Sequence, residues 1–144
     1  MSTPPTPPDP WLRGPLAGIQ APLQPIAHAF IAAREDIERA VTGLTLDQLW
    51  AQPGGVASPG FHLAHRPPAE ELVAAFNLAI SRALERLAAT AERTLTEPRA
   101  VGRAQSPSTV LGLLFHAAEH AARHAGQVVT TAKMIRGLRT RTPA

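Results

Sequence analysis

The longest helical pattern in the sequence is Pro107–Arg136, PSTVLGLLFHAAEHAARHAGQVVTTAKMIR. Ser106 before Pro107 is typical of a helix start, with serine as the N-cap and proline at the first helical position. Gly137 is expected to end the helix. Its apolar residues recur at helical spacing and predict one core face. That face is expected to comprise Leu113, Leu114, Ala117, Ala121, Val128, Ala132 and Ile135.

The composition favours the same secondary structure throughout the chain. Of 144 residues 44% are hydrophobic but only 4% are aromatic, so alanine and aliphatic residues must fill the core. Alanine loses the least free energy on entering a helix, which favours an all-α fold class. The length fits one domain. Because the chain has no cysteine, disulfides and thiolate metal sites are excluded.

Charge and hydropathy limit the partners that we expect. All but Lys133 of the 14 basic residues are arginine, which raises the isoelectric point although the net charge is only +3. No nucleic-acid-binding motif accompanies this charge, so we expect no nucleic-acid partner. No signal peptide and no apolar stretch long enough for a membrane span is found. We therefore expect a cytoplasmic protein without a membrane partner.

The chain divides into a bundle with a tail at each end. Residues 1–21 are expected to form a Pro-rich N-terminal tail, in which Trp11 is the first side chain able to anchor to the bundle. Residues 22–138 are the helical bundle, and residues 139–144 are a basic C-terminal tail. The first helix is predicted over 23–42 from an apolar stripe, and Gly43 ends it. The stripe consists of Ile26, Phe30, Ala33, Ile37, Ala40, Val41 and Leu44.

A short turn and two further helices are predicted between the first and the last helix. Thr45 to Gln48 has the form of a capping box and opens a short turn. Ser58-Pro59 starts a helix that the Pro67-Pro68 pair cuts short after His65. Another helix follows to about residue 91, with a core face of Leu72, Phe76, Ala79, Ile80, Ala83, Leu84 and Leu87. Residues 94–105 are expected to be a connector.

The six histidines are the residues best suited to a functional site. His116, His120 and His124 repeat at four-residue spacing, so they form a slanting row beside the core face of one helix. An i, i+4 histidine pair can bind one metal ion, and neutral imidazole suits zinc, nickel, copper or iron. The spacing fits equally well a run of half-buried polar residues on an amphipathic helix. His62 and His65 lie three residues apart on the short helix, and His28 is expected at the surface or in an interface.

Two segments resemble the DinB superfamily. His116-Ala-Ala-Glu-His120-Ala-Ala-Arg-His124-Ala-Gly-Gln127 resembles the signature of that family's last helix, and residues 57–65, ASPGFHLAH, resemble the start of its second helix. Residues 11–14, 44–50 and 97–103 are also similar to a DinB subgroup, so the likeness covers most of the chain after the tail. The family is similar to the bacillithiol and mycothiol transferases, which are four-helix bundles, are often dimeric and bind one divalent metal on three histidines.

The resemblance implies a ligand set and one departure from the family. By position it implies that His65, His120 and His124 bind a divalent metal, zinc or nickel being the ions we expect, with Gln127 beside the last ligand. His62 and His116 then fall outside the ligand set. The family's second helix continues beyond its histidine, whereas here Pro67 and Pro68 interrupt it. The shortened helix leaves apolar surface that a second subunit could cover, so we expect a homodimer.

Two classes of function follow from this site. In the first, the protein is a metal-dependent enzyme, similar to a thiol S-transferase or a hydrolase, that activates a small-molecule thiol or a water molecule. The thiol must come from a cosubstrate because the chain has none of its own. No general base is evident, since Glu119 is rotated away from the neighbouring histidines. In the alternative, the protein is a non-catalytic metal-binding or structural dimeric helical bundle.

Overall fold

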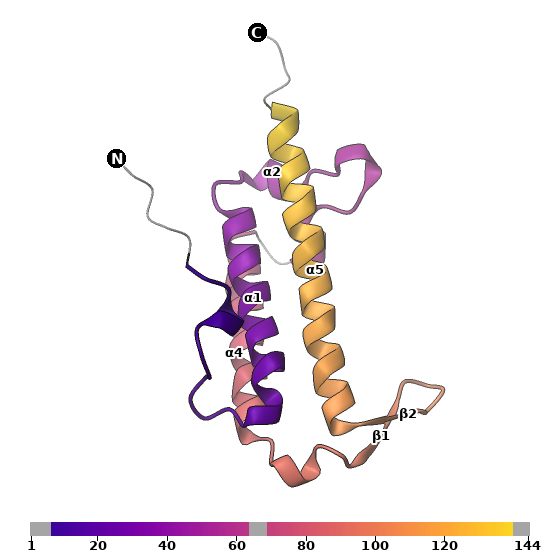
Figure 1. Cartoon of the computed structure of the whole chain (residues 1–144). Helices are drawn as coiled ribbons and strands as arrows, with labels where there is room; N and C mark the ends of the chain where they lie inside the picture. Colours follow the sequence, from indigo (N-terminus) through magenta and orange to yellow (C-terminus); the bar gives the residue numbers. More distant parts are fainter. Residues whose placement is uncertain (1–6, 64–68, 140–144) are drawn as a thin grey trace.

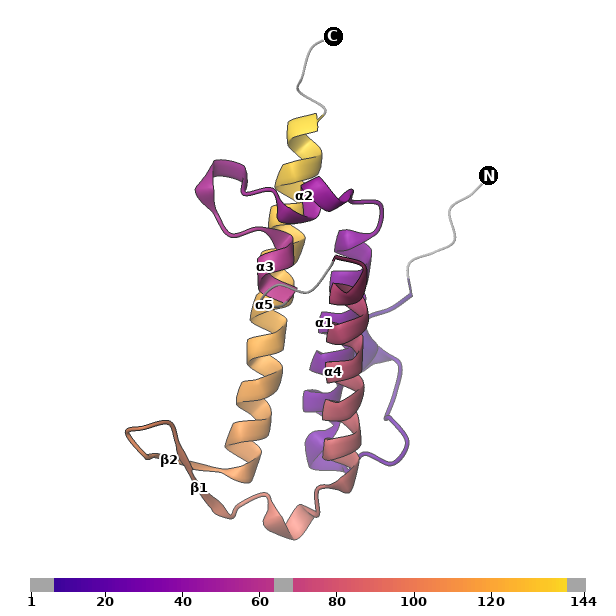
Figure 2. The ribbon, with the colours of Figure 1, turned by 180° about the vertical axis from the view of Figure 1, so that it is seen from behind.

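Three long helices run along the length of the molecule (Figure 1). The computed structural model describes residues 7–63 and 69–139. The long helices are α1 (Gln24–Val41), α4 (Ala69–Ala89) and α5 (Val110–Arg139), and α1 packs against both of the others. The short helices α2 (Leu46–Trp50) and α3 (Pro59–Leu63) lie near the C-terminal half of α5, as the reverse view in Figure 2 also shows. The protein is therefore all-α in class.

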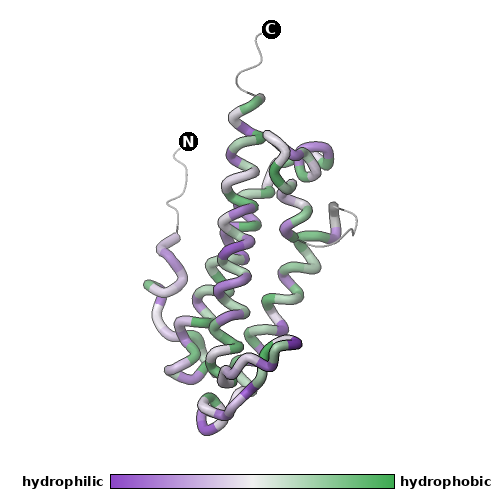
Figure 3. Tube along the Cα trace, turned by 90° about the vertical axis from the view of Figure 1, so that its right-hand side faces the viewer, coloured by the Kyte–Doolittle hydropathy of each residue, from purple (hydrophilic) through white to green (hydrophobic). Residues whose placement is uncertain are grey.

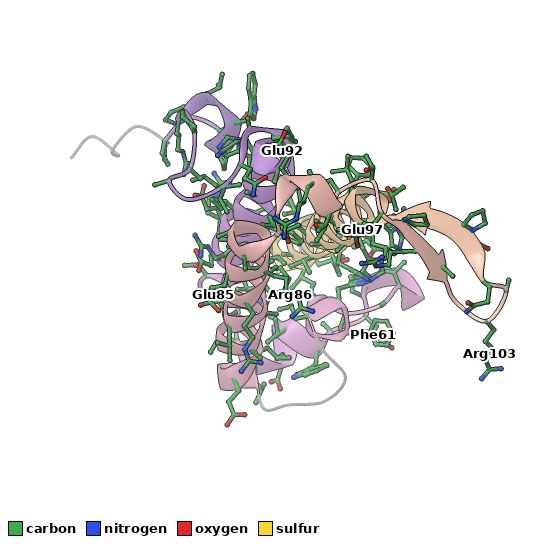
Figure 4. The ribbon with its side chains drawn as sticks, turned by 90° about the horizontal axis from the view of Figure 1, so that it is seen from below. Phe61, Glu85, Arg86, Glu92, Glu97 and Arg103 are labelled. Atoms are coloured by element: carbon green, nitrogen blue, oxygen red, sulfur yellow. The ribbon has the colours of Figure 1, made fainter. Side chains whose placement is uncertain are left out.

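A β-hairpin and four short 3-10 helices complete the described chain. Strands β1 (Pro98–Val101) and β2 (Ser106–Thr109) pair antiparallel in the register Val101↔Ser106 and project from the lower end of the bundle. Seen from below, Arg103 marks the tip of this arm (Figure 4). The 3-10 helices are η1 (Pro10–Leu12), η2 (Ala21–Leu23), η3 (Pro53–Gly55) and η4 (Glu92–Thr94). The sequence predicted a connector over 94–105, and the hairpin is a correction to it.

The start signals of the short helices are confirmed. The Thr45 side chain accepts a hydrogen bond from the Gln48 backbone, and the Gln48 side chain accepts one from the Thr45 backbone. This reciprocal capping box begins α2. The Ser58 hydroxyl accepts from Phe61 N at 3.2 Å and begins α3. Within α3, a side chain at Gly60 would meet the Trp50 ring at 3.0 Å, so glycine allows α3 to pack closely on α2.

The predicted start and end of the last helix are wrong. Ser106 and Pro107 belong to β2, and α5 begins at Val110, where the Thr109 hydroxyl accepts a hydrogen bond from Gly112 N at 3.1 Å. Proline lacks a backbone N–H but is tolerated in an edge strand, so a Ser-Pro pair suits a hairpin as well as a helix start. At the other end, Gly137 lies inside α5, which continues to Arg139.

The core consists of two apolar clusters, stacked along α1. The first joins Ile37 of α1 to Leu49, Leu63, Leu72 and Val128 from the other helices. The second surrounds Phe30 at the opposite end and comprises Leu23, Ile26, Ala27, Phe30, Ile80, Leu87, Leu95 and Ala118. Hydropathy drawn along the chain shows apolar and polar residues alternating along each long helix (Figure 3). No helix in the part that the structure describes is long and apolar enough to cross a membrane.

The predicted core faces are confirmed for α1 and are wrong at one position in each of the other two long helices. Ile26, Phe30 and Ile37 of α1 are all buried. Ala79 of α4 and Ala117 of α5 were expected in the core but are exposed. In α5 the buried alanines include Ala118 and Ala125. The core face of α5 therefore comprises Ala118 and Ala125 together with the predicted Val128, Ala132 and Ile135.

Residues 7–23 lie along α1, and polar bonds hold them there. Arg13 makes two hydrogen bonds to the Glu35 carboxylate, at 2.5 and 2.7 Å. The Gln24 amide bonds the backbone of Leu16 on both its oxygen and its nitrogen. Trp11 is 65% exposed, so the expectation that it anchors this segment is wrong. The segment is instead attached through Arg13 and Gln24.

Arg136 joins the ends of two long helices. Its guanidinium on α5 donates to the carbonyl oxygens of Ala40 and Thr42, both at 2.8 Å. The last carbonyls of a helix have no partner within the helix, so this contact satisfies acceptors at the end of α1. Gly43 follows with φ of 75°, a conformation that glycine adopts without steric cost.

We expect the Arg13–Glu35 pair to make stability depend on pH. Hydrogen bonds from Arg13 outweigh partial burial and hold the pKa of Glu35 below its ordinary value. The stability from this shift is present above the pKa of the unfolded chain and is lost as the pH falls through the folded-state pKa. Glu35→Gln should therefore lower the melting temperature at neutral pH, and the difference should disappear in acid. Asp36→Asn, at a more exposed pair with Arg39, is the matched control. An equal melting temperature for Glu35→Gln at neutral pH would contradict this prediction.

Candidate metal centre

Helix α5 brings two histidines into direct contact. His120 Nε2 and His124 Nε2 lie 3.1 Å apart, and the ring centroids are 4.5 Å apart with the planes nearly perpendicular. His120 is exposed, whereas His124 is half-buried. A step of four residues turns a helix by only about 40°, which places both rings on one side of α5.

The nitrogen separation suits a shared cation. Two nitrogens bound to one tetrahedral zinc ion at ~2.0–2.1 Å would be roughly 3.3 Å apart. Without a cation, the same distance is an ordinary hydrogen bond in which one imidazole donates to the other, the donor depending on the tautomer. The distance therefore fits two ligands of one ion as well as it fits a hydrogen bond between the two rings.

His62 of α3 lies on the other side of His124. The two ring centroids are 5.6 Å apart, and Phe61 meets the His62 ring edge to face. Burial, followed by the proximity of His124, lowers the pKa of His62. The Nδ1 atoms of His62 and His124 are both buried without a hydrogen-bond partner among the residues that the structure describes. Sequence spacing gave no indication of this contact, because it depends on how α3 packs against α5.

The other histidines either do not take part in the contact between His62 and His124 or lie outside the described residues. His65, the expected third ligand, lies outside the described residues. His28, expected at the surface or in an interface, is half-buried, and its Nε2 is 3.1 Å from the carbonyl oxygen of Gly14. His116 is exposed, and its ring centroid is 6.0 Å from that of His120. Within 7–63 and 69–139, no three His, Cys, Asp or Glu side chains are arranged to hold a metal ion.

Glu119 is engaged with its neighbours on α5. Its carboxylate accepts a hydrogen bond from Arg123 at 2.7 Å and lies 3.5 Å from His116 Nδ1. The hydrogen bond from Arg123 lowers the pKa of Glu119, so this carboxylate is charged at neutral pH. The carboxylate therefore lies beside His116, which falls outside the expected ligand set.

An open pocket of about 570 Å³ lies beside His62. One wall is the loop before α3, with Val56 and Ala57, and His62 forms part of the lining. Helix α5 contributes Arg123 and Gln127 among other residues. Guanidinium and amide groups are hydrogen-bond donors, so the pocket combines apolar walls with polar groups, as small-molecule sites do. The sequence indicated Gln127 but not the pocket, since the loop and α5 are far apart in the chain.

Comparisons with family models, with curated proteins and with solved structures found no match for this chain.

Proposed function

We propose that this protein is a metal-dependent enzyme of the DinB type, related in chemistry to thiol S-transferases or hydrolases. The observation that carries the proposal is the 3.1 Å separation between His120 Nε2 and His124 Nε2. His65 would complete a three-histidine set with this pair. Three neutral imidazoles suit zinc or nickel and leave at least one coordination position free.

The residues around the pair suit a small-molecule reaction. A divalent ion bound there would supply Lewis acidity, which lowers the pKa of a thiol or of water. The chain has no cysteine, so a reacting thiol must belong to a cosubstrate. The pocket beside His62 offers space for that cosubstrate, with donors from Arg123 and Gln127 to orient it.

The test measures catalysis with two probes on protein reconstituted with zinc or nickel. Cysteine with the electrophile monochlorobimane reports thiol transfer, and p-nitrophenyl acetate reports hydrolysis. We expect a chelator-sensitive rate in at least one assay, and the double variant His120→Ala, His124→Ala should fall to the background rate. Wild-type protein that carries one ion per chain but is no faster than the double variant in either assay would exclude both proposed reactions for these substrates.

A second candidate function is a non-catalytic dimeric bundle. Its support is the large exposed apolar side chains on two long helices: Leu78 of α4 is 51% exposed and Phe115 of α5 is 62% exposed. Exposed apolar groups of this size are common at protein interfaces, although single ones also occur on monomers. Light scattering distinguishes the assembly states, and a dimer inactive in both assays would favour this candidate.

A further inference from the structure

His116 is the histidine of the α5 row that the proposed site does not use. Its side chain is 63% exposed, and its Nδ1 faces the Glu119 carboxylate at 3.5 Å. A carboxylate beside one ring nitrogen favours a proton there and leaves Nε2 free to bind a cation, as carboxylates behind metal-binding histidines do. His116 therefore has the chemistry of a ligand, although it lies outside the expected ligand set.

Helix α5 itself shows that its i, i+4 histidines can reach a chelating distance. His120 and His124 have this spacing, and their Nε2 atoms are 3.1 Å apart. His116 and His120 have the same spacing on the same continuous helix, so their Cα–Cβ bonds have the same relative direction. Their ring centroids are now 6.0 Å apart with a 46° angle between planes. Both side chains are exposed, so side-chain rotation alone can bring the rings together.

We propose that His116 and His120 form a second, weaker metal position one turn before the His120–His124 pair. It would take the same class of ions, namely zinc, nickel or copper(II), which bind neutral imidazole. The two positions share His120 and are therefore occupied alternately. We call the His116–His120 position the outer position and the His120–His124 pair the inner pair. The outer position has only two protein ligands, and water fills its remaining coordination sites, so it binds metal more weakly.

Two opposite charges, on Glu119 and Arg123, lie near the outer position. Glu119 supplies a negative charge next to His116, and Arg123 pairs with that carboxylate at 2.7 Å. An ion held by His116 and His120 can move to the inner pair while His120 remains bound, so one ligand is exchanged at a time. His116 thereby gives the exposed side of α5 a loading position for the inner site.

The experiment measures Ni²⁺ binding by calorimetry in a background that lacks the inner pair. His124→Ala should retain weak binding of one Ni²⁺ per chain. Adding His116→Ala should weaken that binding by roughly 10- to 100-fold or more, since loss of an outer-shell partner alone costs that much. The matched control adds His28→Ala to His124→Ala and should leave the affinity unchanged. All three variants should keep the helical circular dichroism of the wild type, because alanine is the best helix former.

Two outcomes would contradict the proposal of a second metal position. One is that His124→Ala binds no Ni²⁺, and the other is that adding His116→Ala leaves the affinity unchanged. A further measurement uses the otherwise intact chain: His116→Ala should slow Ni²⁺ uptake while the final stoichiometry stays at the wild-type value. An uptake rate equal to that of the wild type would contradict the role in loading. None of these results depends on catalysis, so the proposed enzyme function is tested separately.

Discussion

We expect the double substitution His120→Ala, His124→Ala to abolish stoichiometric binding of zinc or nickel. The two Nε2 atoms are 3.1 Å apart and would provide two of three protein ligands to one ion. A zinc ion left with one histidine keeps too few protein ligands for a stable site, since zinc usually takes three or four. The loss should therefore be complete at micromolar protein concentration rather than partial.

The fold should survive this change. His120 is exposed and His124 is half-buried, and alanine raises the helix propensity at both positions. The measurement is metal content by atomic emission after reconstitution and desalting, with circular dichroism to follow the fold. His28→Ala is the control, because that side chain bonds Gly14 on the N-terminal segment and should leave metal content at one ion per chain. A double variant that still retains one ion would contradict the proposed centre.

The sequence predicted helices well where local chemistry determines them. The Thr45 capping box and the Ser58 N-cap depend on residues three positions apart, and the structure has both. The hairpin has a weaker signal: Gly102 lies in the turn with φ of 67°, but all four residues of β1 are exposed, so no buried face marks the strand. Backbone pairing of Pro98–Val101 with Ser106–Thr109 creates it. Such pairing depends little on side-chain type.

The prediction chose the wrong alanine at Ala117 and missed Ala118 and Ala125 because α5 is rich in alanine. Alanines at 117, 118, 121, 122 and 125 cover an arc of roughly 140° of the helix. Hydropathy therefore does not distinguish the buried from the exposed positions within that arc. Packing against α1 determines which of these alanines are buried, namely Ala118 and Ala125. The i, i+4 contact of His120 with His124 was predictable because it lies within one helix. The approach of His62 to His124 was not, since it requires the placement of α3.

Two histidines, His62 and His65, are candidates for the third metal ligand beside His120 and His124. His62 lies beside His124, with ring centroids 5.6 Å apart and a buried Nδ1 that has no partner within the described residues. His65 lies outside the described residues, three positions further along the sequence. Three residues turn a helix by 300°, so residues 62 and 65 of one helix would differ in direction by about 60°. One ion is therefore expected to use one of the two as its ligand.

We expect His65→Ala to weaken metal affinity far more than His62→Ala. Loss of an outer-shell partner typically costs roughly 10- to 100-fold in affinity, and loss of a ligand should exceed that range. His62→Ala should stay within the range and act mainly on stability, because the half-buried ring packs against Phe61 and His124. The measurement is zinc affinity by competition with a chromogenic chelator, with both single variants titrated side by side and their melting temperatures recorded. If His62→Ala releases the metal while His65→Ala retains it, His62 is the ligand and the proposed set is wrong at that position. If both variants keep wild-type affinity, neither residue is a ligand and the ion is held by α5 alone.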